Sequence, residues 1–229
     1  MRRMITQRGL VVSCQAYEGE PLFGPHHMAE MAKAAVLGGA IGIRANGTAD
    51  IAAIKAVVNV PVIGLLKRRV GDCPVYITPT LEDACAVHAA GADIVAIDGT
   101  RRLRPDGTTI RQVVEELTRL GVRVMADVST LEEGLHAAEL GVQYISTTLS
   151  GYTPYSPETN KPDIELVRRL AQETRLPVVA EGRFTSAEQM VQALNAGAQF
   201  VVVGSAITRP QDITERYRKA IEAQVVLNS

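Results

Sequence analysis

Apolar runs that resemble buried strands alternate with amphipathic, helix-like stretches along the whole 229-residue sequence. Regular alternation of this kind predicts repeated strand–helix units and a parallel sheet. We expect eight strands, over residues 10–15, 40–45, 61–67, 93–98, 123–128, 144–149, 177–181 and 200–204. Eight units in a near-regular array favour a closed (β/α)₈ TIM barrel over an open doubly wound sheet.

Signals for helix ends and helix starts between the apolar runs support this fold. A glycine followed by alanine or valine opens every even strand, at positions 39, 91, 141 and 197. Each glycine would end a helix just before the next strand begins. The segments Thr130–Glu133 and Thr185–Glu188 match the capping-box pattern of a helix start, and Thr80–Asp83 nearly matches it. Since no linker divides the chain, we predict a single barrel domain over residues 1–229.

The amino-acid composition supports buried parallel strands and argues against several kinds of partner. Hydrophobic residues make up 46% of the chain but aromatic residues only 4%, which suits aliphatic parallel strands buried on both faces. The net charge of -1, without long charged blocks, argues against nucleic-acid or anionic-membrane partners. The three cysteines lack metal-type spacing, which favours reduced thiols and a cytoplasmic location. No apolar run approaches the ~20 residues that a membrane span needs.

Polar residues end the four odd-numbered strands of the predicted barrel. They are an amide, an amine and two carboxylates: Gln15, Lys67, Asp127 and Glu181. Alternate strands of such a barrel contribute side chains to one interior layer, and the top layer faces the active-site mouth. Because a buried charge is costly unless it is paired or used, this convergence predicts chemistry rather than packing.

Lys67 and Glu181 would face each other across the barrel, from strands three and seven. A lysine is a useful base only when its neutral form is populated. Burial and nearby cations such as Arg44 would lower its pKa, whereas Glu181 would raise it. The alternative is an ion pair that only closes the top of the barrel.

Three further residues are candidate ligand contacts at the barrel mouth. Arg44, at the end of strand two, could bind a carbonyl or hydroxyl oxygen, or it could pair with Asp98 on strand four. Gln15 and Asp127 could form hydrogen bonds within the mouth, where they would still orient a polar ligand.

The loops after strands seven and eight predict a phosphate site. They contain Gly182 with Arg183, and Gly204 with Ser205. In barrels of this type these loops and a short extra helix often bind phosphate through backbone N–H groups and the helix dipole. Arg183 or Arg209 could add a charge-assisted bond. The alternative is that both glycines serve only tight turns.

The histidines give no sign of a metal site. None of the four, His26, His27, His88 and His136, falls at alternating strand ends. We therefore predict chemistry without a metal and without a cofactor.

Six segments together resemble one family of phosphosugar enzymes. They are Ile43–Gly47, Pro61–Lys67, Tyr76–Thr80, Thr147–Thr153, Glu181–Arg183 and Gly204–Pro210. Across essentially the whole chain the sequence is similar to N-acetylmannosamine-6-phosphate 2-epimerases. One departure is Asp98–Thr100, whose middle residue is Gly99 where alanine is expected.

The resemblance implies an isomerase of bacterial sialic-acid catabolism, which interconverts N-acetylmannosamine 6-phosphate and N-acetylglucosamine 6-phosphate. It matches the catalytic lysine and glutamate to Lys67 and Glu181, and the sugar contacts to Gln15, Arg44, Asp127 and Arg209. Epimerisation removes the proton beside the open-chain aldehyde and returns it on the other face, through an enolate. We assign Lys67 as the proton shuttle and Glu181 as the group that holds or re-protonates it. One-base and two-base schemes stay open, and no group is assigned to ring opening.

Two other readings compete. Another phosphosugar isomerase on this barrel is one, although metal-dependent pentose-phosphate epimerases need His and Asp ligands at strand ends that this sequence lacks. A non-catalytic phosphosugar-binding barrel is the other; it would keep the phosphate glycines but would not need Lys67 opposite Glu181. The sequence leaves open the oligomeric state, with a homodimer as one option, the preferred acyl group and the physiological direction.

Overall fold

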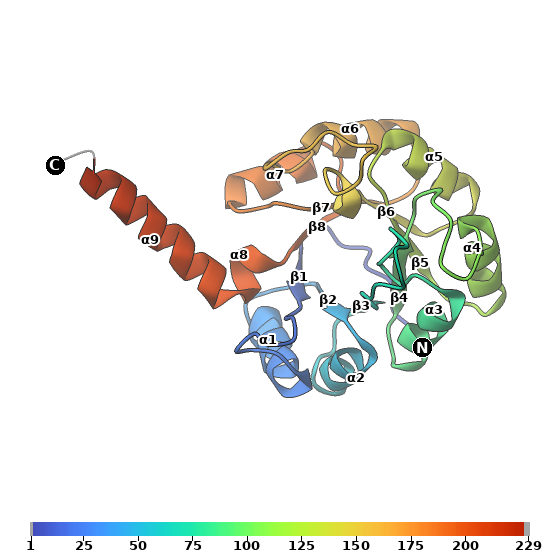
Figure 1. Cartoon of the computed structure of the whole chain (residues 1–229), viewed down its shortest axis with the longest axis horizontal. Coiled ribbons are helices and arrows are strands. Elements are labelled where there is room, and N and C mark those ends of the chain that lie inside the picture. The colour runs from blue at the N-terminus through green and yellow to red at the C-terminus, as the bar shows by residue number, and fades with distance from the viewer. Residues whose placement is uncertain (1, 227–229) are drawn as a thin grey trace.

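The apolar runs form eight parallel strands that close into a barrel, with β8 returning to pair with β1 (Figure 1). The structure, a computed structural model, describes residues 2–226. Its strands are β1 Leu10–Cys14, β2 Gly42–Asn46, β3 Val62–Leu65, β4 Ile94–Asp98, β5 Val124–Asp127, β6 Tyr144–Ser146, β7 Val178–Glu181 and β8 Phe200–Val203. The predicted (β/α)₈ barrel is thereby confirmed, and each of the eight predicted ranges overlaps a strand.

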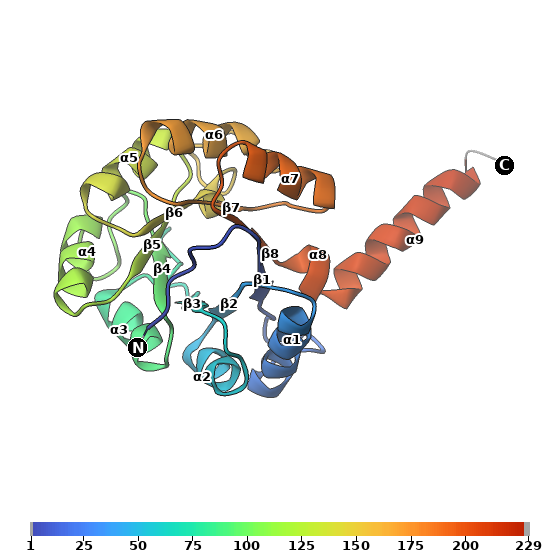
Figure 2. The ribbon, with the colours of Figure 1, turned by 180° about the vertical axis from the view of Figure 1, so that it is seen from behind.

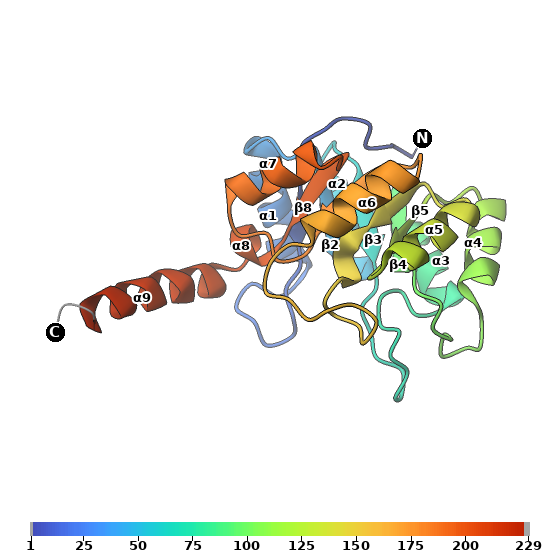
Figure 3. The same cartoon turned by 90° about the horizontal axis from the view of Figure 1, so that it is seen from above.

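Helices follow the strands and surround the barrel (Figure 1). They are α1 Pro25–Leu37, α2 Thr48–Val57, α3 Leu81–Ala89, α4 Ile110–Arg119, α5 Leu131–Glu139, the 3₁₀ turn η1 Thr147–Leu149, α6 Ile164–Glu173, α7 Ala187–Asn195, α8 Ser205–Thr208 and α9 Pro210–Val226. The N-terminal segment crosses the amino-terminal end of the barrel (Figure 2), where Ile5 N–H donates to the Tyr144 hydroxyl at 3.0 Å. The opposite, carboxyl end carries the long loops (Figure 3).

Alternate residues of each strand divide the core into two parts. One set packs outward against the helices, and the other fills the interior of the barrel. The interior set includes Met125, Tyr144 and Phe200. The rings of Tyr144 and Phe200 meet edge to face, with 5.8 Å between their centres. Burial of each such side chain stabilises the folded state by about 1.5–3 kcal/mol. The interior therefore ends in a packed floor beneath the carboxyl-terminal mouth.

Two predicted strand ends are wrong, for the same physical reason. The prediction ran β3 to Lys67, but the strand ends at Leu65, and Lys67 instead forms an antiparallel bridge with Ile77. The prediction ran β6 to residue 149, but residues 147–149 form η1. Hydrogen bonds with residues far away in the sequence accompany both strand ends: Leu66 N–H donates to Thr78 Oγ1 at 3.1 Å, and Glu181 N–H, from the end of β7, donates to Thr147 Oγ1 at 3.1 Å.

Helix starts follow the capping signals closely. The boxes at Thr80 with Asp83 and at Thr130 with Glu133 are confirmed. The predicted start at Thr185 is wrong by one residue, because Ser186 is the cap and Gln189 completes the box. Gln189 Oε1 also accepts from the Thr185 N–H at 2.9 Å, which leaves Thr185 just outside the helix.

The last helix departs from the pattern of the outer ring. α9 extends away from the barrel instead of packing beside α7 and α1 (Figures 1 and 2). Tyr217 and Ile221, one turn apart on α9, are 62% and 65% exposed. On α7, Val191 is 54% exposed. Apolar surface thus lies uncovered both on α9 and on the helix that borders the vacant position of the outer ring.

Candidate active site

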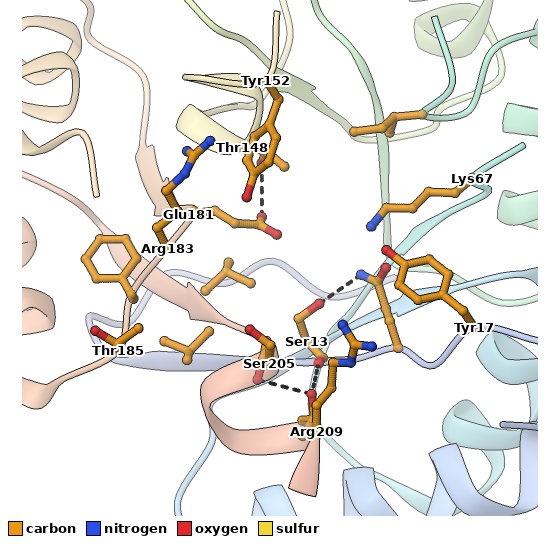
Figure 4. A pocket seen from close by; sticks show the side chains of 18 of the residues that line it. Ser13, Tyr17, Lys67, Thr148, Tyr152, Glu181, Arg183, Thr185, Ser205 and Arg209 are labelled. Carbon is orange, nitrogen blue, oxygen red and sulfur yellow. Dashed lines mark hydrogen bonds between the residues drawn. The ribbon is translucent and has the colours of Figure 1, made fainter. Parts of the chain in front are cut away.

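A cavity of about 340 Å³ opens at the carboxyl ends of the strands (Figure 4). Its wall is made of strand-end and loop residues: Ser13, Gln15, Tyr17, Lys67, Tyr76, Ile77, Thr148, Tyr152, Glu181, Gly182, Arg183, Phe184, Thr185, Val202, Val203, Gly204, Ser205, Thr208 and Arg209. This is the end of a (β/α)₈ barrel where active sites are found. Eight of the ten predicted site residues belong to this wall, and the other two are Arg44 and Asp127.

Lys67 reaches the cavity from the loop after β3. Its backbone is fixed by the bridge to Ile77 and by a hydrogen bond from its N–H to Asn46 Oδ1 at 2.7 Å. The side chain points across the cavity toward Glu181 (Figure 4), and its ammonium lies 5.9 Å from the centre of the Tyr17 ring. The amine therefore faces the space that a ligand would fill.

Glu181 enters the cavity from the opposite side, as the last residue of β7. Its Oε2 lies 3.0 Å from the Thr148 hydroxyl and 3.0 Å from Arg44 Nη1. Burial raises the pKa of Glu181, and the charge of Asp127 raises it further, while Arg44 and Lys67 act against the shift. A carboxyl group in this position keeps its proton to a higher pH than a solvated glutamate does.

Arg44 lies at the centre of a buried charge cluster below the cavity. Its guanidinium donates to both oxygens of Asp127, at 3.1 and 2.5 Å, and both side chains are fully buried. Arg44 therefore does not pair with Asp98, the alternative that the sequence allowed. Asp98 accepts instead from Arg102 at 2.7 Å and from the Thr100 hydroxyl at 2.6 Å.

Gln15 lies just beyond the end of β1. Its Nε2 donates to Ser13 Oγ at 2.8 Å. Within residues 2–226, its buried Oε1 has no hydrogen-bond partner. The side chain is held in place by one end and retains an acceptor at the cavity wall.

The predicted phosphate loops form one side of the cavity. Gly182 has a φ of 113° and Arg183 a φ of 59°, so the chain turns sharply after β7. The Arg183 guanidinium donates to the carbonyls of Ser150 and Gly151, at 2.7 and 3.0 Å, and lies 3.9 Å from the centre of the Tyr152 ring. Its side chain thus anchors the loop between η1 and α6, while the backbone at this turn faces the cavity.

Arg209 closes the same side, between α8 and α9. It forms ion pairs with Glu20, from the loop after β1, and with Asp212 at 3.3 Å. Gly204 and Ser205 precede it at the start of α8. The predicted phosphate loops and this arginine therefore border one part of the cavity.

Sequence reasoning missed several uncharged residues of the site. Thr148 lies between two carboxyl groups, and Tyr76 lines the cavity. Burial, with the nearby charges of Asp127 and Asp98, raises the pKa of Tyr76 to about 12, so the phenol stays a hydrogen-bond donor. Both residues fall in the segments that carry the family resemblance, which was the one signal available.

Gly99, the departure noted in the sequence, lies against the charge cluster. Its N–H donates to the Asp127 carbonyl at 2.7 Å. A Cβ at this position would come within 2.9 Å of that carbonyl oxygen and of Ala126 Cβ. In this chain, glycine allows the ends of β4 and β5 to approach this closely.

Two kinds of site are not found in the described part of the chain. No group of three or more His, Cys, Asp or Glu side chains within residues 2–226 could hold a metal ion. None of the helices in that range has the length and apolar character that a bilayer crossing requires.

Comparison with known proteins identifies the family. A family model described as "Putative N-acetylmannosamine-6-phosphate epimerase" matches residues 28–223. The chain belongs to this family. Relatives bearing the corresponding 2-epimerase name include one from Caldanaerobacter subterraneus subsp. tengcongensis, 54% identical over 92% of this chain and 90% of its own length. Another, from Cutibacterium acnes, is 50% identical over 93% of each.

A solved structure agrees with this membership of the N-acetylmannosamine-6-phosphate epimerase family. The N-acetylmannosamine-6-phosphate 2-epimerase from Clostridium perfringens superposes with a TM-score of 0.91, at 44% identity over 94% of each chain. A thiamine phosphate pyrophosphorylase from Pyrococcus furiosus superposes with a TM-score of 0.60 at 20% identity, which shows only the shared fold.

Proposed function

We propose that this protein interconverts N-acetylmannosamine 6-phosphate and N-acetylglucosamine 6-phosphate, by removing and returning the proton at C2 of the open-chain sugar. The observation that carries the proposal is the amine of Lys67 facing the carboxyl of Glu181 across the cavity. The names and structures of the relatives support the same reaction. Sialic-acid catabolism is the setting that such a reaction would serve.

Two groups on opposite sides of C2 suit an inversion. Lys67 takes the proton from one face, which leaves an enolate, and Glu181 delivers a proton to the other face. Lysine thereby becomes an ammonium, and the glutamic acid becomes a carboxylate. The reverse reaction uses the same groups with exchanged roles, so the protons balance in both directions.

The remaining predicted residues would position the sugar relative to Lys67 and Glu181. Gln15 and Arg209 offer an acceptor and a cation to the cavity. Arg44 and Asp127 lie beneath Glu181, so we assign them to holding that carboxyl group in place, with sugar contact requiring Glu181 to move. Such positioning matters because small displacements of reacting atoms lower rates strongly.

The phosphate group would bind at the loops that contain Gly182, Arg183, Gly204 and Ser205. Backbone N–H groups at such turns approach an anion closely. This remote binding energy would orient C2 between the two catalytic groups.

Removal of the phosphate from the substrate should therefore cost activity. We expect kcat/KM for unphosphorylated N-acetylmannosamine to fall at least 10²-fold, about the effect of losing one or two charge-assisted contacts. Coupled or NMR assays with each sugar measure this. Equal kcat/KM values for the two sugars would remove the phosphate site from the account, and binding of the phosphosugar without turnover would favour the non-catalytic barrel.

A homodimer is the assembly that the uncovered apolar surfaces favour. Tyr217 and Ile221 lie on one face of α9, and Val191 is exposed on α7, where the outer ring is open. An α9 from a second copy would cover this surface and bury its own apolar face in the same contact.

Substituting both apolar residues of α9 should weaken the dimer. Tyr217→Ser with Ile221→Ser removes two side chains worth about 1.5–3 kcal/mol each when buried, so we expect dissociation to rise at least tenfold. Sedimentation of the full chain measures this, with Lys219→Ser, an exposed polar position on the same helix, as the matched control. Wild-type protein that sediments with the mass of one chain at all concentrations would exclude the dimer.

We further infer a cytoplasmic location. Cys14, Cys73 and Cys85 are all unpaired thiols, as is usual in a reducing compartment. A phosphorylated amino sugar would be met there as a metabolic intermediate.

A further inference from the structure

Thr148 occupies an unusual position between two carboxyl groups. Its hydroxyl oxygen lies 2.9 Å from Asp127 Oδ1, 3.0 Å from Glu181 Oε2 and 2.8 Å from Ser146 Oγ. The residue is part of η1, the turn that replaces the predicted end of β6. This turn brings the hydroxyl between the ends of β5 and β7, where the two carboxyl groups lie.

The three contacts of the Thr148 hydroxyl cannot all be hydrogen bonds unless one of the two carboxyl groups carries a proton. A hydroxyl has one proton to donate and two lone pairs that accept. If Asp127 and Glu181 were both ionised, Thr148 could donate to only one of them, and the other contact would bring two acceptor oxygens together. All three contacts become hydrogen bonds when Ser146 donates to Thr148, Thr148 donates to one carboxylate, and the other carboxyl carries a proton that it donates to Thr148.

The charge cluster decides which carboxyl group carries this proton. Asp127 accepts two hydrogen bonds from Arg44, at 3.1 and 2.5 Å, and such a bidentate pair favours the ionised acid. Glu181 meets Arg44 through one contact of 3.0 Å, while the hydrogen bonds of that arginine go to Asp127. The cluster thus has one fully paired carboxylate, Asp127, and one group that is only partly compensated, Glu181.

We propose that Thr148 is a positioning residue that holds the proton of Glu181: it accepts the Glu181 O–H and donates its own hydrogen to Asp127. When Glu181 gives its proton away, the hydroxyl turns and donates to the new carboxylate. Glu181 thereby keeps a hydrogen bond to Thr148 in both protonation states without moving a heavy atom, and Asp127, when it loses the Thr148 hydrogen, keeps its two bonds from Arg44. For catalysis this inference rests on the proposed function, but the proton itself exists without substrate.

The direction of the Glu181 pKa agrees with this arrangement. Burial raises the pKa of Glu181, so the protonated form persists above the usual carboxyl range. A group whose pKa is raised in the folded state stabilises the protein at low pH and loses that contribution as pH rises through the folded value. The proton-donating form of the site should be lost over that same interval.

Infrared spectroscopy of the substrate-free, full-length protein tests the proton directly. At neutral pH we expect a carboxylic-acid C=O band, which shifts when glutamate carboxyls carry ¹³C, does not shift when aspartate carboxyls do, and is missing in Glu181→Gln. Absence of the band, or a shift with labelled aspartate, would overturn the assignment. Neither result depends on turnover, so a failure here is distinct from a failure of the proposed reaction.

Separate variants test the role of Thr148. Thr148→Val removes the hydroxyl at similar shape and should move the acid band to higher frequency, whereas Thr148→Ser should restore the wild-type band. Thr147→Val is the matched control, because the Thr147 hydroxyl bonds the backbone of Glu181, at 3.0 and 3.1 Å, and not its carboxyl. Thr148→Val should also lower kcat about tenfold with little change in KM, and Thr148→Ser should recover it. An unchanged band in Thr148→Val would exclude the proposed role.

Discussion

Replacing Lys67 with methionine should remove most of the turnover and leave the barrel folded. Methionine keeps most of the length of the stem but has no amine to take the C2 proton. The residue lies beyond the end of β3, above the packed interior, so the core layers lose nothing. We expect kcat to fall by at least the ~10²–10⁴ typical of a lost general base, measured beside thermal unfolding by circular dichroism.

Controls separate catalysis from surface effects. Lys33→Met alters an exposed lysine of α1 that pairs with Glu30 on the same helix, and it should leave turnover unchanged. Glu181→Gln should also slow the reaction, and with Lys67→Met the combined loss should be smaller than the product of the single losses if the two groups act as a unit. A folded Lys67→Met protein that still exchanges the C2 proton at near wild-type rate would remove lysine from the mechanism.

Replacing Arg44 with leucine should have the largest effect on stability. It leaves Asp127 buried without its cation, and breaking one partner of a buried ion pair costs about 3–5 kcal/mol. Urea unfolding measures the loss. Arg44→Lys should recover only part of it, because an ammonium cannot make the two parallel bonds that Asp127 now accepts.

The loss in Arg44→Leu should depend on pH. Protonation of a buried carboxylate removes the cost of its unpaired charge, so the gap in unfolding free energy from wild type should shrink as pH falls. Adding Asp127→Asn to Arg44→Leu should recover stability at neutral pH for the same reason. A gap that stays constant from neutral to acid pH would instead indicate that Arg44 matters for packing.

The sequence predicted the barrel well because its strands are buried on both faces. Such strands read as continuous apolar runs, for instance Phe200–Val203, and need no knowledge of distant residues. Strand ends were predicted less well, since contacts with distant parts of the chain decide them. Lys67 pairs with Ile77, and Thr147 bonds the backbone of Glu181. Neither contact has a local signature.

Residues of the candidate site could be picked out from the sequence where a charge ends an apolar run. Lys67 and Glu181 are visible for this reason, and both line the cavity. The partner of Arg44 was not predictable, because Asp98 and Asp127 both end strands and lie opposite each other in register. Arg102, four residues after Asp98, forms the ion pair with Asp98, and Arg44 pairs with Asp127 instead.

Uncharged and long-range features of the chain escaped sequence reasoning. Thr148 bears no charge, and its importance comes from lying between two carboxyl groups. α9 has the amphipathic sequence of a packing helix, yet nothing local tells whether it packs on its own barrel. Both features depend on how separate segments meet in space.

The most direct test of the central claim is to incubate the full-length protein with either phosphosugar in deuterated water and to follow C2 by NMR. Both starting sugars should reach the same mixture of N-acetylmannosamine 6-phosphate and N-acetylglucosamine 6-phosphate, with deuterium entering at C2 because the amine and the carboxyl group exchange their protons with solvent. If the folded protein leaves both phosphosugars unchanged, the proposed epimerisation is wrong.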